Sequence, residues 1–242
     1  MDIGDCVKFL KSISDVFTLA EVLITLGIIG VVAALTLPSL IQKNNNKVVE
    51  TRLKKFYSTM NQAIMMAEVD YGDKKIWYEA VAGAEIDTDG NTVPGSSQAE
   101  KWFNKYLAPY LKIVKTETLS DGSYMVYFSD GSAIRPWRDS TSDWYFYPGN
   151  PQKCIEKYGT HVHAANGKCS FTFIFSPAND SESMKYHYNK GIEPYKFDWD
   201  GNNQKLYQGS TYACGGNEPH YCTAIIQMNN WTIPDDYPYK VS

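Results

Sequence analysis

The chain has 242 residues, of which 43% are hydrophobic and 21% are charged, so wholesale disorder is excluded. Its formal net charge of −4 argues against nucleic-acid binding through a broad basic surface. Aromatic residues are unevenly distributed, since only Phe9 and Phe17 precede Phe56 and all 18 tyrosines follow it. We therefore expect an aliphatic N-terminal segment joined to a polar, tyrosine-rich domain.

The N-terminal segment contains an uncharged run from Val22 to Gln42. As a helix it would be about 31 Å long, which matches the hydrocarbon core of a bilayer of about 30 Å. A buried soluble helix is a weaker interpretation because it would usually have a polar face. A secretory signal peptide would place Glu21 in its apolar region, and no A-x-A cleavage site follows. We therefore predict a membrane-inserting helix.

The residues Phe17–Gly30, FTLAEVLITLGIIG, resemble the N-terminal class III signal of type IV pilins and type II secretion pseudopilins. The resemblance covers residues 16–40. It implies that a prepilin peptidase cuts between Val16 and Phe17 and methylates the new amino terminus at Phe17. That family usually has Gly before the cut, where this chain has Val16. The resemblance implies a leader peptide at 1–16 and a transmembrane, filament-core helix at 17–42.

Two further residues take a role from the same resemblance. Glu21 would be the fifth residue after the cut, and it would pair with the amino terminus of a neighbouring subunit during filament assembly. Pro38 would be the twenty-second and would kink the helix. Without the flanking motif, the preferred interpretation of Glu21 is a snorkelling acid at a helix N-terminus, where the helix dipole favours it.

Basic residues after the apolar run conflict with the membrane topology that the resemblance implies. The positive-inside rule would hold that side in the cytoplasm, whereas the resemblance places it outside. We follow the resemblance and expect a single-pass protein of the bacterial inner membrane with its globular domain outside the cytoplasm. The charges in question are Lys43, Lys47, Arg52, Lys54 and Lys55, against Glu50.

Residues 43–71 have the periodicity of an amphipathic stalk helix. Gly72 is expected to end this helix. Its apolar face would consist of Val49, Leu53, Phe56, Met60, Ile64 and Ala67.

The remainder, residues 72–242, is predicted to be a pilin-like globular domain. The fold class is therefore α+β, with the long N-terminal helix packed on a C-terminal antiparallel β-sheet. Within the domain we expect a helix at 102–113, two strands around a Ser-Asp-Gly turn at 123–137, strands at 169–177 and 222–233, and loops at 85–97, 148–167 and 198–220.

Four cysteines remain once Cys6 leaves with the leader, and they allow three pairings. We favour the pairs of sequence neighbours, Cys154 with Cys169 and Cys214 with Cys222, in an oxidising compartment. A zinc site is the alternative, but the spacings lack the usual short C-x₂₋₄-C pair.

Two other kinds of metal site are open. His161 and His163 could share a strand face and bind a metal with His187 or His220, although scattered histidines are more often surface residues. Asp198, Asp200 and Asn202 resemble the start of a calcium loop, and the segment 87–91 does so more weakly. Both acidic segments lack the closing bidentate Glu, and D-G-N is also common in turns.

Enzyme motifs such as G-x-S-x-G and H-E-x-x-H are absent from the sequence, so we do not expect an enzyme. We expect a pilin-like structural subunit, such as a minor pseudopilin of a type II secretion system or a related type IV filament. Its partners would be the prepilin peptidase, other pilin-like subunits and an inner-membrane assembly platform. The alternative is a membrane-anchored adhesin or glycan-binding protein that uses the helix only as an anchor.

Overall fold

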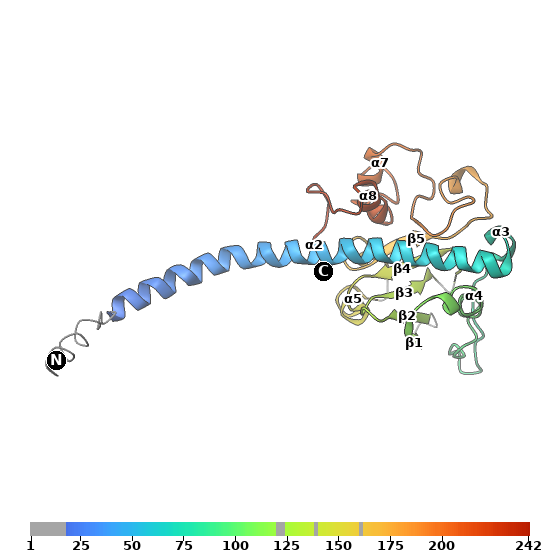
Figure 1. Ribbon diagram of the computed structural model, residues 1–242, viewed down its shortest axis with the longest axis horizontal. Coiled ribbons are helices and arrows are strands. Elements are labelled where there is room, and N and C mark those ends of the chain that lie inside the picture. Colours follow the sequence, from blue (N-terminus) through green and yellow to red (C-terminus); the bar gives the residue numbers. More distant parts are fainter. Residues whose placement is uncertain (1–17, 120–123, 138–139, 160–161) are drawn as a thin grey trace, which may run out of the picture. The chain divides into compact units, whose positions relative to one another are not determined.

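A computed structural model describes residues 18–119, 124–137, 140–159 and 162–242 (Figure 1). The helices are α2 (Leu19–Tyr71), α3 (Lys74–Trp77), α4 (Gln98–Tyr106), α5 (Pro151–Tyr158), α6 (Val162–Ala165), α7 (Gln204–Tyr207) and α8 (Cys222–Met228), with 3₁₀ turns η1 (Ala108–Tyr110) and η3 (Glu182–Met184). The strands are β1 (Ile113–Thr118), β2 (Tyr124–Phe128), β3 (Ala133–Pro136), β4 (Asp143–Tyr147), β5 (Phe171–Ile174) and β6 (Glu193–Pro194).

The chain divides into two compact units, residues 1–43 and residues 44–242. The first unit contains the apolar half of α2, and the second contains the rest of α2 with every other element named above. The helix ends where the sequence predicts, because Gly72 follows Tyr71 at φ +83° and donates its amide to the Glu68 carbonyl.

In the described residues of the second unit, six strands form one antiparallel sheet in the order β1-β2-β3-β4-β5-β6. Each strand therefore pairs with its neighbours in the sequence. The predicted turn lies between β2 and β3, where Gly131 has φ +80° and donates to the Phe128 carbonyl. The α+β prediction is confirmed, and a long N-terminal helix before an antiparallel sheet is a pilin-like layout.

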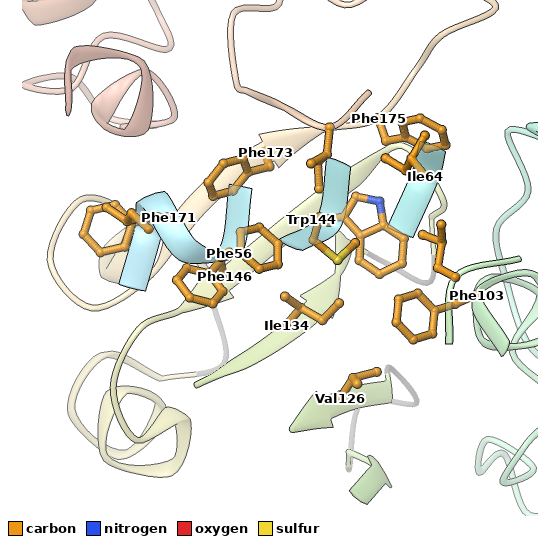
Figure 2. Packing of buried hydrophobic residues seen from close by; sticks show 14 of the residues in the cluster. Phe56, Ile64, Phe103, Val126, Ile134, Trp144, Phe146, Phe171, Phe173 and Phe175 are labelled. Carbon is orange, nitrogen blue, oxygen red and sulfur yellow. The ribbon is translucent and has the colours of Figure 1, made fainter. Parts of the chain in front are cut away.

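One face of the sheet packs against α2. The Phe56 ring stacks on Phe146 of β4 at a centroid distance of 4.2 Å and meets Phe173 of β5 edge-on at 4.9 Å. Figure 2 shows these three rings together, with Ile64 farther along the same helix facing Trp144 and Phe175. The buried stripe of α2 is the predicted one with Ala63 added: Val49, Leu53, Phe56, Met60, Ala63, Ile64 and Ala67.

The other face of the sheet is also buried. Side chains alternate along a strand, so Tyr145 and Tyr147 of β4 point away from Phe146 and into a second cluster. That cluster includes Cys154 of α5 and Cys169, which form a disulfide. The predicted loop at 148–167 thus contains α5 and α6, which cover this face.

The predicted last strand at 222–233 is wrong, because residues 222–228 form the helix α8. Five consecutive residues from Cys222 to Ile226 are buried, a pattern that strands and helices share in short apolar runs. The sheet already ends at β6, and α8 packs against β5 and β6 instead. Its end is a tight turn in which Asn230 and Trp231 have φ values of +55° and +62°.

Two smaller boundaries also differ from the sequence prediction. The helix predicted at 102–113 begins at Gln98, because the Ser97 hydroxyl accepts a hydrogen bond from the Glu100 amide and caps the first turn. It ends at Tyr106, and Pro109 then lies in the 3₁₀ turn η1. The predicted loop at 198–220 contains the one-turn helix α7.

Candidate assembly helix and sites of the globular unit

The side chains of the apolar half of α2 are exposed and are not covered by other parts of the described chain. The large aliphatic side chains from Leu19 to Ile41 have exposed fractions from 41% at Val22 to 78% at Leu19. Among the described residues, α2 is the one helix that is long and apolar enough to cross a membrane, by length and composition. This surface is suited to lipid or to other apolar helices and not to water.

Glu21 lies in the first turn of this helix and is bound by Thr18. The Thr18 amide and hydroxyl donate to Glu21 Oε2 at 2.8 and 2.9 Å, and the Glu21 amide lies 3.2 Å from Thr18 Oγ1. This reciprocal arrangement is a capping box, which satisfies backbone amides that a helix start leaves unpaired. Sequence reasoning missed Thr18, although the T-x-x-E spacing ahead of an apolar run would have indicated it.

The other predicted residues of the N-terminal signal have different outcomes. Val16 and Phe17 lie outside the described residues, so cleavage and methylation there stay predictions. Pro38 lies inside α2, which continues through it to Tyr71. Proline cannot donate the backbone hydrogen bond that a helix interior requires. The predicted kink at Pro38 stays a prediction.

Both predicted disulfides are formed in the structure. Cys154 of α5 is bonded to Cys169 just before β5, and their Cα atoms are 5.9 Å apart. Cys214 is bonded to Cys222 at the start of α8, with Cα atoms 4.7 Å apart. All four cysteines are buried. Disulfides persist in oxidising compartments, so this pairing indicates an extracytoplasmic globular unit.

Arg52 and Lys55, two of the five cations that follow the apolar run, contact residues outside α2. Arg52 donates to the carbonyl oxygens of Asp130, at 2.7 Å, and of Pro148. Lys55 Nζ lies 2.7 Å from Asp130 Oδ2. Burial disfavours the charge of Asp130, but hydrogen bonds from Lys55 and Ser132 outweigh it and hold the pKa of the carboxyl at about 2. Arg52 and Lys55 thus have a structural role that is independent of membrane topology.

The predicted calcium ligands lie in a turn that uses their oxygens internally. Asp200 Oδ1 accepts from the Asn202 amide and Asn202 Oδ1 accepts from the Gln204 amide, each at 3.0 Å. Asp200 Oδ2 lies 2.8 Å from Lys205 Nζ, and Asp198 and Asp200 line a cavity of about 310 Å³. A calcium ion would have to displace the Lys205 ammonium group from Asp200. Calcium binding here stays a prediction.

The weaker candidate at residues 87–91 is a turn of the same kind. Asp87 Oδ1 accepts hydrogen bonds from the amides of Asp89 and Asn91, at 3.0 and 2.8 Å. A single bridge between Ile86 and Thr92 closes the turn. These are ordinary turn contacts.

Comparison with known families matches residues 39–241 to DUF6613, a family of unknown function. No curated protein and no solved structure matches the chain. The match begins just after Pro38, so it covers the globular unit and leaves out Phe17–Gly30. In this chain the globular unit follows an exposed apolar helix. Because most of its length is matched, the chain belongs to the family of unknown function DUF6613.

Proposed function

We propose that the protein is a pilin-like structural subunit, such as a minor pseudopilin of a type II secretion system or a related type IV filament. In this role the apolar half of α2 holds the chain in the inner membrane before assembly. The same helix then packs among the helices of other subunits in the filament. The globular unit lies outside the cytoplasm, where its two disulfides are stable.

The observation that carries this proposal is an exposed apolar helix that starts with a carboxylate. A plain membrane anchor needs only a hydrogen-bond acceptor for this cap, whereas an ionised carboxylate near hydrocarbon is costly unless its charge is paired. In the family that Phe17–Gly30 resembles, the partner is the amino terminus of the neighbouring subunit. Glu21 would supply the same counter-charge here.

The layout of the second unit supports the same role. The half of α2 from Asn44 onward is fixed to the sheet through Phe56 and the rest of its buried stripe. Filament packing through the apolar half of the helix would then carry the globular unit with it. Such a subunit needs no catalytic site. Its partners would be the prepilin peptidase, other pilin-like subunits and the assembly platform.

The first test is processing in cells that produce the chain together with a prepilin peptidase. We expect the intact mass of the membrane-derived protein to correspond to a chain that begins at an N-methylated Phe17. A chain that still begins at Met1, or one cut after Ala34, would contradict the proposal.

The second test is assembly in cells that also contain the filament machinery. Glu21→Leu should leave the protein in the membrane fraction, because it removes a charge near lipid. Its recovery in sheared filaments should fall at least tenfold. Lys54→Gln removes one exposed charge from the same helix outside the apolar half and serves as the control. Equal recovery of Glu21→Leu and wild type would instead favour a membrane-anchored adhesin.

A further inference from the structure

Three potential metal ligands lie together where two disulfide-closed segments meet. His163 belongs to α6, inside the segment closed by Cys154–Cys169. Glu218 and His220 lie inside the segment closed by Cys214–Cys222. One ligand atom from each of the three side chains lies within 4.8 Å of the other two. Each disulfide therefore restrains the backbone that carries one part of this cluster.

His220 is held in an orientation that frees one ring nitrogen. Its side chain is buried, and its Nδ1 lies 3.3 Å from Thr172 Oγ1 and 3.4 Å from Asn166 Nδ2. Nε2 is therefore left for another ligand. Such contacts to the second nitrogen are what fixes the ring of a metal-binding histidine.

His163 supplies the second imidazole and has an unsatisfied nitrogen. Its ring meets the His220 ring edge-on, with centroids 5.0 Å apart and an interplanar angle of 84°. Its Nδ1 is buried and has no hydrogen-bond partner among the described residues. The centroid of the Trp137 ring lies 5.3 Å from that of the His163 ring. A buried ring nitrogen without a partner is unfavourable, and a bound cation would satisfy it.

We propose that His163, Glu218 and His220 bind one Zn²⁺ ion. Two imidazoles and one carboxylate suit a borderline metal such as zinc, whereas calcium and magnesium prefer oxygen ligands. With bond lengths of about 2.0–2.2 Å, tetrahedral ligand atoms are about 3.3 Å apart, so the three side chains need to close in by only a small movement. The fourth position would be filled by water.

The ion would join two segments that the disulfides close separately. His163 precedes β5, while Glu218 and His220 precede α8, and Thr172 of β5 contacts the His220 ring from the sheet. Zinc would thus act as a third cross-link on the face of the sheet opposite α2. This inference concerns the globular unit alone and does not depend on the proposed role in filaments.

The test uses the full chain in detergent, stripped with EDTA under non-reducing conditions and titrated with ZnCl₂ by calorimetry. We expect one equivalent of zinc to bind and to raise the melting temperature. Addition of CoCl₂ instead should give the visible absorption of tetrahedral cobalt. Glu218→Gln and His163→Ala should each weaken zinc binding at least tenfold, because each removes a ligand.

A control variant and the metal-free melting curves distinguish loss of a zinc ligand from other effects. Glu182→Gln, an exposed acid whose carboxylate pairs with Lys185, should bind zinc within twofold of wild type. The metal-free melting curves of Glu218→Gln and His163→Ala should stay cooperative, which separates a lost ligand from a lost fold. The proposal is overturned if folded wild type binds no zinc, or if both ligand variants bind it as wild type does.

Discussion

Thr18 and Glu21 bind each other at the start of α2, and the Glu21 carboxylate accepts both the amide and the hydroxyl of Thr18. The carboxylate therefore has two donors from its own chain before any neighbouring subunit arrives. A role in capping and a role in assembly would both use this side chain. The two roles differ in what they require, since capping needs an acceptor and assembly needs a negative charge.

Substitutions at these two positions separate the roles. Thr18→Val removes the hydroxyl and should cost about 1 kcal/mol of helix stability through the lost cap. It keeps the Glu21 charge, so recovery in sheared filaments should stay within about twofold of wild type. Glu21→Gln keeps a hydrogen-bond acceptor but removes the charge, and its recovery should fall at least tenfold. If both variants lose filaments equally, capping and not charge is the function of Glu21.

The two disulfides should contribute unequally to stability. In the chain-entropy model, the 15-residue separation of Cys154 and Cys169 is worth about 3 kcal/mol and the 8-residue separation of Cys214 and Cys222 about 2.5 kcal/mol. Replacing both cysteines of the first pair by alanine should lower the melting temperature of a fragment 44–242 by about 6–12 °C. Non-reducing peptide mapping of wild type checks the pairing. Four free thiols in protein from the cell envelope would contradict an extracytoplasmic globular unit.

Gly167 is expected to be intolerant of any side chain. It has φ +74°, and a Cβ atom there would lie 2.4 Å from Cys222 Sγ and 3.0 Å from the Tyr237 hydroxyl oxygen. Gly209 is the matched control, because it has φ +79° with nothing within 4 Å of the added atom. Gly209→Ala should cost about 1–2 kcal/mol from backbone strain. Gly167→Ala should cost about 1–3 kcal/mol more from overpacking, measured by denaturant unfolding.

Similar losses for the two alanine variants would show that the segment around Gly167 can move away from the second disulfide.

The buried His187 should make stability depend on pH. Its Nε2 accepts a hydrogen bond from the Lys196 amide at 3.1 Å, and burial, aided by the charges of Lys196 and Lys190, lowers its pKa from 6.5 to about 3. Between these values the unfolded chain binds a proton that the folded chain does not. The free energy of unfolding should therefore fall as pH falls from about 6.5, by up to about 1.4 kcal/mol per pH unit from this group.

His187→Gln tests this dependence, because glutamine keeps an acceptor and has no charge to gain. Unfolding by denaturant at several pH values should give a flatter curve for the variant between pH 4 and about 6.5. Curves that run parallel for wild type and variant would mean that His187 has the same pKa in the folded protein as in the unfolded chain.

Features that depend on short-range patterns could be predicted from the sequence. The buried stripe of α2 follows from apolar spacing of three and four residues, and the β2–β3 turn follows from Ser129, Asp130 and Gly131. The two disulfides join the cysteines that are nearest in sequence. In each case the determining residues are few and close together.

Features that depend on tertiary packing could not be predicted. The residues of β4, Asp143–Tyr147, are flanked by sheet on both sides and packed on both faces, so they show no alternation of polar and apolar side chains. The run from Cys222 fits a strand or a helix equally well, and only its packing against β5 and β6 decides. The sequence left His187 and His220 both open as metal-binding partners of His163 and placed His163 on a strand, whereas the fold brings His163 to His220 and has it on α6.

The strand order affects how this domain folds while its chain is synthesised from the N-terminus. Each new strand finds its partner already present, because the preceding strand in the sequence is its neighbour in the sheet. The half of α2 from Asn44 onward does not find its partners present, because it precedes all six strands in the chain. Its Phe56 packs on rings that belong to β4 and β5. The apolar stripe of α2 therefore stays uncovered until most of the domain has been synthesised. During this stage the exposed stripe makes the incomplete chain prone to aggregation, whereas strand pairing can proceed as each strand appears.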